Sequence, residues 1–263
     1  MTTSTDFDAM ERANRERAGT LRHLLRSRRL PAVSRGYISP DAVPIVMCLW
    51  NRPERLPVML ELIAAQTTEL PVRLMLWNNN VSHRAEYEEA VARAPLGPRQ
   101  SVELFESPDN IGGIARFVVA RWLRESGLAG PFIMLDDDLD VREDFVDHLV
   151  GEYLPEQISA WWAFTNRGSH WERDELESGA VATYTGTGGT VTDLAIVDDP
   201  AFFDIPDRYF MLEDQWMTHR AKKRGWALRK SGVDITQVPE ELARNQSLLM
   251  LPLKDEFFHF LHR

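Results

Sequence analysis

The stretch PFIMLDDD, residues 131 to 138, indicates the fold, because a short apolar run leads directly into three consecutive aspartates. The apolar run is typical of a buried strand. Adjacent carboxylates repel one another, and burial raises the free-energy cost of each charge. A buried strand that ends in three acids therefore requires a compensating positive charge, and we expect a bound cation to supply it.

Similar strands recur in the first half of the chain, and each is followed by a helix-forming segment. The expected strands are residues 43–50, 71–80, 101–107 and 131–138, and the expected helices are 54–66, 84–94 and 112–126. This alternation predicts an α/β protein with a mostly parallel sheet and helices on both faces. Ligands of such sheets bind at the carboxyl ends of the strands. Polar residues follow each strand there: Asn51 and Arg52, Asn78 to Asn80, Asp109 and Asn110, and the three aspartates.

The second half is less regular. We expect a strand at 157–168, two strands joined by the glycine-rich turn TGTGG within 181–197, and a helix at 213–225. These segments suggest three parts: a basic helical extension (1–40), a nucleotide-binding half (41–140) and an acceptor half with the tail (141–263). The two halves are expected to form one compact domain.

Charge and composition narrow the classes of protein. The net charge is −10, which argues against broad nucleic-acid binding, yet residues 1–35 hold eight arginines against four acidic residues. That segment predicts a helix from about Ala9 to Arg29. It either touches an anionic surface or packs on the body through Leu21, Leu24, Leu25 and Leu30.

The lone cysteine, Cys48, excludes an internal disulfide and lies in an apolar run, as a buried, unreactive thiol does. No apolar run approaches the ~20 residues that a membrane-spanning helix needs. The N-terminus is polar and lacks a signal-peptide core. These features predict a cytoplasmic protein.

The aspartates favour a metal site. Side chains alternate along a strand, so Asp136 and Asp138 share a face and Asp137 points away. Two carboxylates suit Mg²⁺ or Mn²⁺, which complete their coordination with phosphate oxygens and therefore imply a phosphorylated ligand. The alternative is an acid-rich turn that caps the next helix.

A series of motifs between residues 43 and 230 resembles family-2-type glycosyltransferases of the GT-A fold: PIVMCLWNRP, LWNNN, DNIGGIARF, FIMLDDDL and FMLEDQWMTHRAKKRGW. The resemblance implies a nucleotide-sugar donor, with a UDP-sugar as the first expectation, and a divalent metal. It places donor contacts at Asn51, Arg52, Asn78, Asn79, Asn110, Gly112, Arg116, Asp136 and Asp137. It also assigns the metal to Asp136 and Asp138, and a late histidine, His259, is the candidate for a further ligand.

The resemblance further implies an inverting reaction. Glu213 and Asp214 match its acidic pair, with Asp214 as the base that takes the proton of the acceptor hydroxyl. The alternative role of this pair is compensation of the helix dipole. Acceptor contacts are expected at Gly188, Gly189 and Trp216, although Trp216 could equally be a core aromatic. The tryptophans Trp161, Trp162 and Trp171 either stack on a sugar ring or belong to the core.

Two rival functions remain open. A nucleotidyltransferase shares acids at strand ends, but it would have a glycine- and lysine-rich loop after the first strand, where this chain has NRPERLP. A catalytically inactive nucleotide-sugar-binding protein would keep the same donor site. The acceptor class (glycan, protein, small molecule or nucleic acid) and the oligomeric state stay open too.

Overall fold

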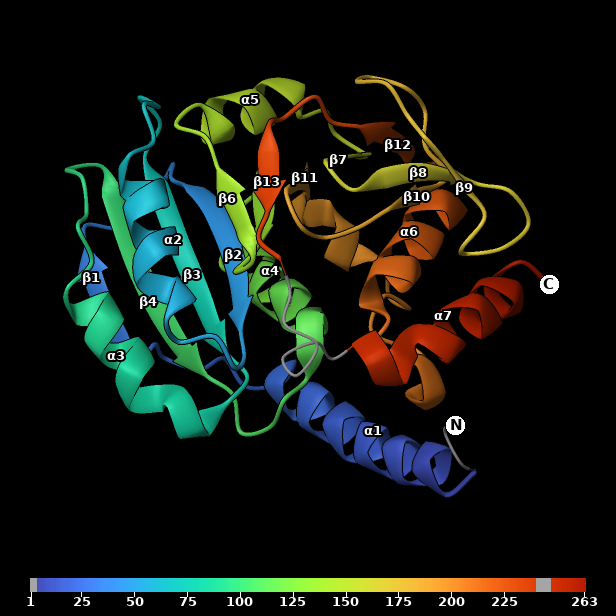
Figure 1. The fold of residues 1–263 in the computed structure, drawn as a ribbon. Helices are drawn as coiled ribbons and strands as arrows, with labels where there is room; N and C mark the ends of the chain where they lie inside the picture. Colours follow the sequence, from blue (N-terminus) through green and yellow to red (C-terminus); the bar gives the residue numbers. More distant parts are fainter. Residues whose placement is uncertain (1–3, 240–246) are drawn as a thin grey trace.

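The centre of the protein is an eight-stranded sheet with the order β1-β4-β3-β2-β5-β11-β7-β12 (Figure 1). A computed structural model describes residues 4–239 and 247–263. The strands of this sheet are β1 (Val33–Gly36), β2 (Val43–Leu49), β3 (Val72–Asn78), β4 (Gln100–Glu106), β5 (Pro131–Asp136), β7 (Gln157–Ala160), β11 (Thr190–Asp193) and β12 (Ala227–Lys230).

Four neighbouring strands, β4, β3, β2 and β5, are parallel, which confirms the predicted sheet. The register pairs Cys48 of β2 with Asp136 of β5, and Leu49 of β2 with Asn78 of β3. The carboxyl ends of these strands therefore meet at one edge of the sheet. β11 is antiparallel to both β5 and β7, so the second half departs from simple alternation.

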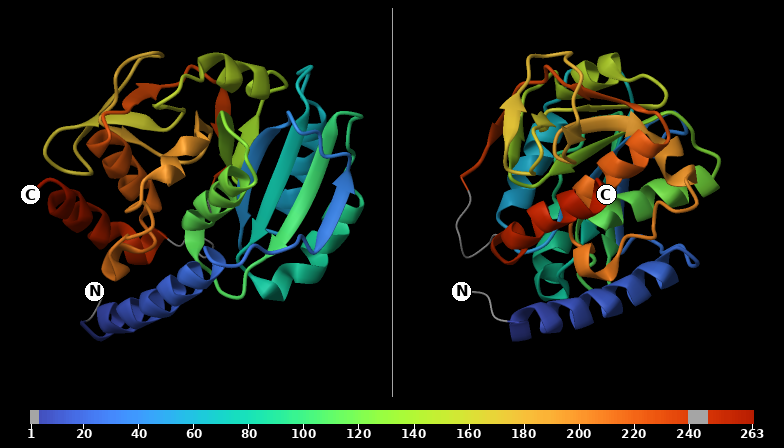
Figure 2. Two further views of the ribbon diagram at one scale, coloured as in Figure 1. Left: turned by 180° about the vertical axis from the view of Figure 1, so that it is seen from behind. Right: turned by 90° about the vertical axis from the view of Figure 1, so that its right-hand side faces the viewer.

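Helices cover both faces of the sheet. Ile45, Met47 and Leu49 of β2 belong to a core cluster with α2 (Arg55–Ala64), α3 (Arg84–Ala92) and α5 (Phe145–Glu152). The intervening Val46 belongs to the other cluster, on the face covered by α4 (Ala115–Glu125). This division follows from the period-two alternation of strand side chains. Seen from behind, α4 crosses in front of the sheet (Figure 2).

The remaining elements are short strands and helices, most of them in the second half of the chain. They are β6 (Leu139–Val141), β8 (Ala163–Asn166), β9 (Arg173–Glu175), β10 (Tyr184–Thr185), α6 (Glu213–Lys223), β13 (Ile235–Gln237) and the short 3₁₀ helices η1 (Val81–His83), η2 (Gly112–Ile114), η3 (Leu194–Asp198) and η4 (Asp207–Tyr209). The expected strand at 157–168 is in fact two strands, β7 and β8, which belong to different sheets. The chain changes sheets at Trp161 and Trp162.

A helix lies near each end of the chain. The N-terminal α1 (Ser4–Leu24) ends earlier than predicted, and α7 (Ser247–Leu261) is a helix that the sequence did not predict. Leu21 and Leu24 are buried, and the indole Nε1 of Trp122 donates to the Leu24 carbonyl at 3.1 Å. Leu30 is 88% exposed, so its predicted packing was wrong. Within the described ranges, no helix is both long and apolar enough to cross a bilayer.

Candidate active site

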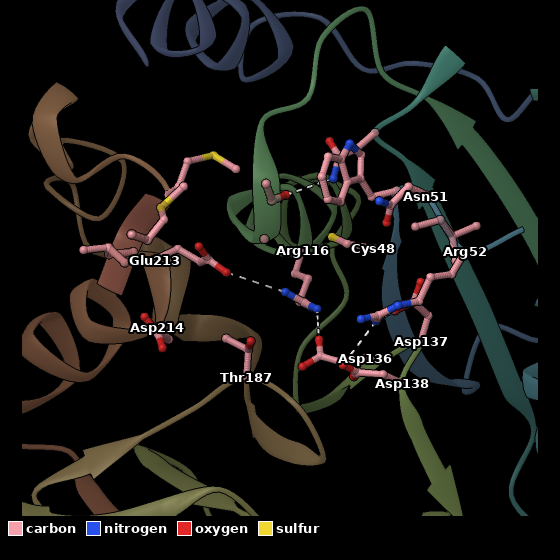
Figure 3. A pocket seen from close by; sticks show the side chains of 18 of the residues that line it. Cys48, Asn51, Arg52, Arg116, Asp136, Asp137, Asp138, Thr187, Glu213 and Asp214 are labelled. Carbon is pink, nitrogen blue, oxygen red and sulfur yellow. Dashed lines mark hydrogen bonds and ion pairs between the residues drawn. The ribbon is translucent and has the colours of Figure 1, made fainter. Parts of the chain in front are cut away.

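A cavity of about 310 Å³ lies at the carboxyl ends of β2, β3 and β5. Its walls come from opposite sides: the aspartates follow β5 on one side, and Glu213 and Asp214 begin α6 on the other (Figure 3). Most of the predicted donor and catalytic residues line it: Asn51, Arg52, Asn79, Gly112, Arg116, Asp136, Asp137, Asp138, Glu213 and Asp214. Cys48 also contributes, and burial raises the pKa of its thiol to about 12, so it stays protonated.

Two arginines lie against the three aspartates. Arg52 Nη1 lies 3.0 Å from Asp137 Oδ1 and 3.2 Å from Asp138 Oδ2. Arg116 donates to Asp136 Oδ1 from the centre of the cavity (Figure 3). Burial nevertheless raises the pKa of Asp137 to about 6, in spite of the Arg52 charge. Protein side chains therefore supply part of the positive charge that the sequence led us to expect from a cation.

The same aspartates fit a divalent metal. Arg116 occupies only Oδ1 of Asp136 and Arg52 only Oδ2 of Asp138, so each carboxylate keeps its other oxygen without a partner among the described residues. Among all the residues that the structure describes, no group of three or more His, Cys, Asp or Glu side chains is arranged to hold a metal. Mg²⁺ and Mn²⁺ sites often use one or two carboxylates together with phosphate oxygens and water. Asp136 and Asp138 match that donor set.

The acids at the start of α6 have different environments. Glu213 lies 3.7 Å from Arg116 Nη1, and its burial, reinforced by the Asp214 charge, raises its pKa to about 7. Asp214 lines both cavities; Tyr184 Oη donates to its Oδ2, and the Gln215 amide donates to its Oδ1 at 2.7 Å. These two hydrogen bonds fix the orientation of a carboxylate that faces the cavity.

The loop DNIGG, residues 109 to 113, borders the cavity beside the end of β3. Asn79 Nδ2 donates to the Gly112 carbonyl at 3.1 Å, and Asn79 Oδ1 accepts from the Ile111 amide at 3.1 Å. Asn110 Oδ1 accepts from the Gly112 amide at 2.9 Å, which fixes the turn. Gly112 has φ +67°, a conformation that favours glycine. Asn79 and Asn110 therefore hold the backbone of this loop in place.

Asn78 does not reach the cavity. Its side chain is fully buried, Nδ2 donates to Glu106 Oε2 at 3.0 Å, and Oδ1 accepts from the Asn80 amide at 2.8 Å. Asn78 is the last residue of β3, and its amide joins β3 to β4. The structure thus corrects its predicted role as a donor contact.

A second cavity of about 300 Å³ adjoins the first. The two share Asp136, Asp138, Thr187, Asp214 and Lys254. Gly188 also lines the second cavity, and a Cβ there would lie 2.5 Å from Asp136 Oδ2, so the close approach of this turn to β5 requires glycine. Tryptophans supply much of the remaining wall: Trp161, Trp162 and Trp171.

Besides Asn78 and Asn110, three further predicted residues lie outside both cavities. Trp216 is 7% exposed, stacks on Phe257 and donates its Nε1 hydrogen to the Phe202 carbonyl at 2.6 Å, so it is a core residue and no acceptor platform. A Cβ at Gly189 would collide with Ile235 and approach Trp161, and Gly189 lines neither cavity. The side chain of His259 is 57% exposed and pairs with Asp255 at 3.3 Å, away from Asp136 and Asp138.

Sequence reasoning did not single out several residues that line the second cavity. They are His170, Arg173, Tyr184, Thr187 and Lys254. Thr187 belongs to the motif TGTGG and Tyr184 directly precedes it, so that motif could have indicated both residues. His170, Arg173 and Lys254 belong to no motif, and only the fold brings them together.

The comparisons with known proteins are structural. No protein-family model matches the chain, and no curated protein matches it significantly. The solved structure of S. aureus TarS, a GT-A family 2 glycosyltransferase, superposes with a TM-score of 0.52 at 12% identity, covering 75% of this chain and 37% of TarS. The chain has the GT-A fold.

Two further structures show the range of this likeness. A TarS fragment, residues 1 to 349, in complex with UDP superposes with a TM-score of 0.50 at 13% identity, covering 72% of this chain and 57% of the fragment. The inositol-1-phosphate CTP transferase from T. maritima has a TM-score of 0.47 at 10% identity, covering 83% and 98%. From the coverages given for TarS and its fragment, this chain spans about one third to three fifths of the length of the TarS chains. In the GT-A sheet of this protein, both cavities lie at the carboxyl edge.

Proposed function

We propose that the protein is a metal-dependent, inverting glycosyltransferase that moves a sugar from a nucleoside diphosphate donor, with UDP as the expected nucleotide, to an acceptor hydroxyl. One observation carries the proposal. Asp136 and Asp138 line both cavities from the β5 side, and Asp214 lines both from the α6 side. A sugar placed between them would have its leaving group beside the arginines and its anomeric carbon facing Asp214.

The first cavity would hold the donor. Arg52 and Arg116 supply positive charge beside the space for a diphosphate, and a metal held by Asp136 and Asp138 would act as a Lewis acid on that leaving group when bound. The GT-A fold supports this assignment, because the TarS fragment with that fold is solved in complex with UDP.

The second cavity would hold the acceptor. Asp214 takes the proton of the acceptor hydroxyl as the acceptor oxygen forms a bond to the anomeric carbon. The bond between that carbon and the diphosphate oxygen breaks, and its electron pair leaves with the nucleoside diphosphate. This single displacement inverts the anomeric configuration, which the proton coupling constant of the product reports.

Replacement of the base tests the proposal directly. We expect Asp214→Asn to lower the rate of sugar transfer, or of donor hydrolysis by water, by roughly 10²–10⁴-fold. UDP affinity should stay unchanged, because the amide keeps the shape of the side chain. Mass spectrometry of donor consumption and calorimetric titration of UDP give the two measurements. The exposed Asp204→Asn, on the neighbouring loop, is the matched control.

Two results would contradict this function. If the wild-type protein binds UDP but consumes no UDP-, GDP- or TDP-sugar, it is a nucleotide-sugar-binding protein without catalysis. If it forms a nucleotide-sugar from a nucleoside triphosphate and a sugar phosphate, it is a nucleotidyltransferase.

A further inference from the structure

The wall of the second cavity combines aromatic rings with cationic side chains. Trp161, Trp162, Trp171 and Tyr184 line it, and the rings of Trp161 and Trp162 lie 5.4 Å apart. Such rings pack against the apolar face of a sugar and leave its hydroxyl groups unsatisfied. The polar partners must therefore come from the other residues of the wall.

Arg173 is held by aromatic rings instead of carboxylates. Its guanidinium lies 4.7 Å from the ring centre of Phe164 and 5.5 Å from that of Trp162. Among the described residues, it has no ion pair and no side-chain hydrogen bond. Stacking uses the face of the guanidinium and leaves its N–H donors for a ligand in the plane.

Lys254 lies where the two cavities meet, and it comes from α7. In the part of the chain that the structure describes, its ammonium group has no hydrogen-bond or ion-pair partner. The acids nearby already have partners: Arg116 for Asp136, Arg52 for Asp138, and Tyr184 for Asp214. Lys254 therefore adds a second unpaired positive charge to the wall.

His170 lies in the same cavity wall as these two cations. Its side chain is 2% exposed, and its Nδ1 has no hydrogen-bond partner among the described residues. Burial lowers its pKa to about 4; the Asp214 charge opposes this shift, and the nearby charges of Lys254 and Arg173 add to it. The imidazole is therefore neutral at pH 7, and the two cations lie close enough to His170 to act on it.

We propose that the acceptor is a saccharide that carries an anionic group, a phosphate or a carboxylate, and that Arg173 and Lys254 bind this group. The inference rests on the proposed function, because it assigns the second cavity to the acceptor. The tryptophans contact the sugar ring, and Asp214, in the same cavity, receives the proton of the reacting hydroxyl. Recognition of an anion by two unpaired cations uses charge-assisted hydrogen bonds, which are stronger than neutral ones.

Matched sugars test the acceptor class without knowledge of the natural acceptor. Saturation-transfer NMR with the protein–UDP complex compares methyl glucoside, methyl glucuronide and methyl glucoside 6-phosphate, and the same series built on galactose and on N-acetylglucosamine. We expect an anionic member of at least one series to bind about tenfold or more tightly than its neutral parent. If the uronide binds more tightly than the 6-phosphate, the anionic group is a carboxylate; if the 6-phosphate binds more tightly, it is a phosphate.

The variants Arg173→Gln and Lys254→Gln should each reduce this preference, and together they should abolish it. Arg167→Gln is the control, because Arg167 lies in the same region but pairs with Asp174 outside the cavity. Equal binding of neutral and anionic members in every series, or a preference that survives in the double variant, would overturn the proposal. Failure of the glycosyltransferase function itself would appear separately, as a wild-type protein that does not bind UDP or consume its sugars.

Discussion

At the scale of single residues, the site is a balance of buried acids and arginines. Arg116 contacts Asp136 and lies 3.7 Å from Glu213, so one side chain joins the β5 wall to the α6 wall. Gly113 leaves space for this contact, because a Cβ at this position would collide with both Glu213 and Arg116. The acids therefore keep their positions through Arg116 before any donor or metal binds.

The hydrogen bond from Tyr184 to Asp214 predicts a positioning effect on catalysis. Tyr184→Phe keeps the ring but removes the donor, and a hydrogen bond to a charged group contributes about 1.5–3 kcal/mol. We expect kcat to fall by about tenfold or more, with the KM for the donor unchanged. Steady-state kinetics checks this. Tyr209→Phe removes a similar hydrogen bond, to Glu256, outside both cavities and should leave kcat unchanged.

The raised pKa of Glu213 predicts a pH dependence of stability. Burial shifts this pKa from its ordinary 4.5 to about 7, so the folded protein binds a proton that the unfolded chain releases. Stability from this group is thus present below pH 4.5 and is lost as the pH rises to about 7.

The isosteric variant Glu213→Gln should remove the loss of folding stability that accompanies ionisation of Glu213. The free energy of unfolding of the variant minus that of the wild type should be larger at pH 8 than at pH 5, as measured by urea denaturation at both values. Glu61→Gln, at an exposed position on α2, is the control. A stability difference between Glu213→Gln and the wild type that does not change with pH would contradict the shift.

At the scale of elements, strand ends and helix starts position the chemistry. The parallel register places the ends of β2, β3 and β5 side by side, and α6 starts with its acids opposite them. α7 then brings Lys254 to the boundary between the cavities. The N-terminal helix α1 instead has a structural role, because its leucines pack into the core around α4.

The packing of α1 predicts its contribution to stability. Leu24 is fully buried, so Leu24→Ala should lower the free energy of unfolding by about 2–5 kcal/mol. Leu30→Ala, at an 88% exposed position, should change it by less than about 0.5 kcal/mol. Urea denaturation compares the two. An equal effect of both substitutions would show that α1 does not pack as described.

At the scale of the whole molecule, the parallel half of the sheet could be predicted from the sequence, because its strands are buried on both faces and appear as continuous apolar runs. The acids after β5 and at the start of α6 were predicted from motifs. The segment 157–168 could not be assigned to two sheets, since its change of direction at Trp161 and Trp162 depends on tertiary contacts. α7 was missed, in part because it contains Pro252, a residue that disfavours helix interiors.

The grouping of His170, Arg173 and Lys254 could not be predicted for a related reason. Lys254 lies more than eighty positions after His170 and Arg173, and no local pattern links it to them. Arg173 also has two aromatic partners that come from the β8 region, so its environment exists only in the folded chain. By contrast, Trp216 was misjudged because a tryptophan beside an acidic pair is equally compatible with a core and with a site.

The central claim is that Asp138 and Asp136 hold a divalent ion that binds the diphosphate of the donor. Calorimetric titration of UDP into the wild type with Mn²⁺, into the wild type with EDTA, and into Asp138→Asn with Mn²⁺ tests it most directly. We predict that UDP binds in the first case and that its affinity falls by about tenfold or more in the other two. Equal UDP affinity in all three titrations, or no UDP binding in any, would contradict the account.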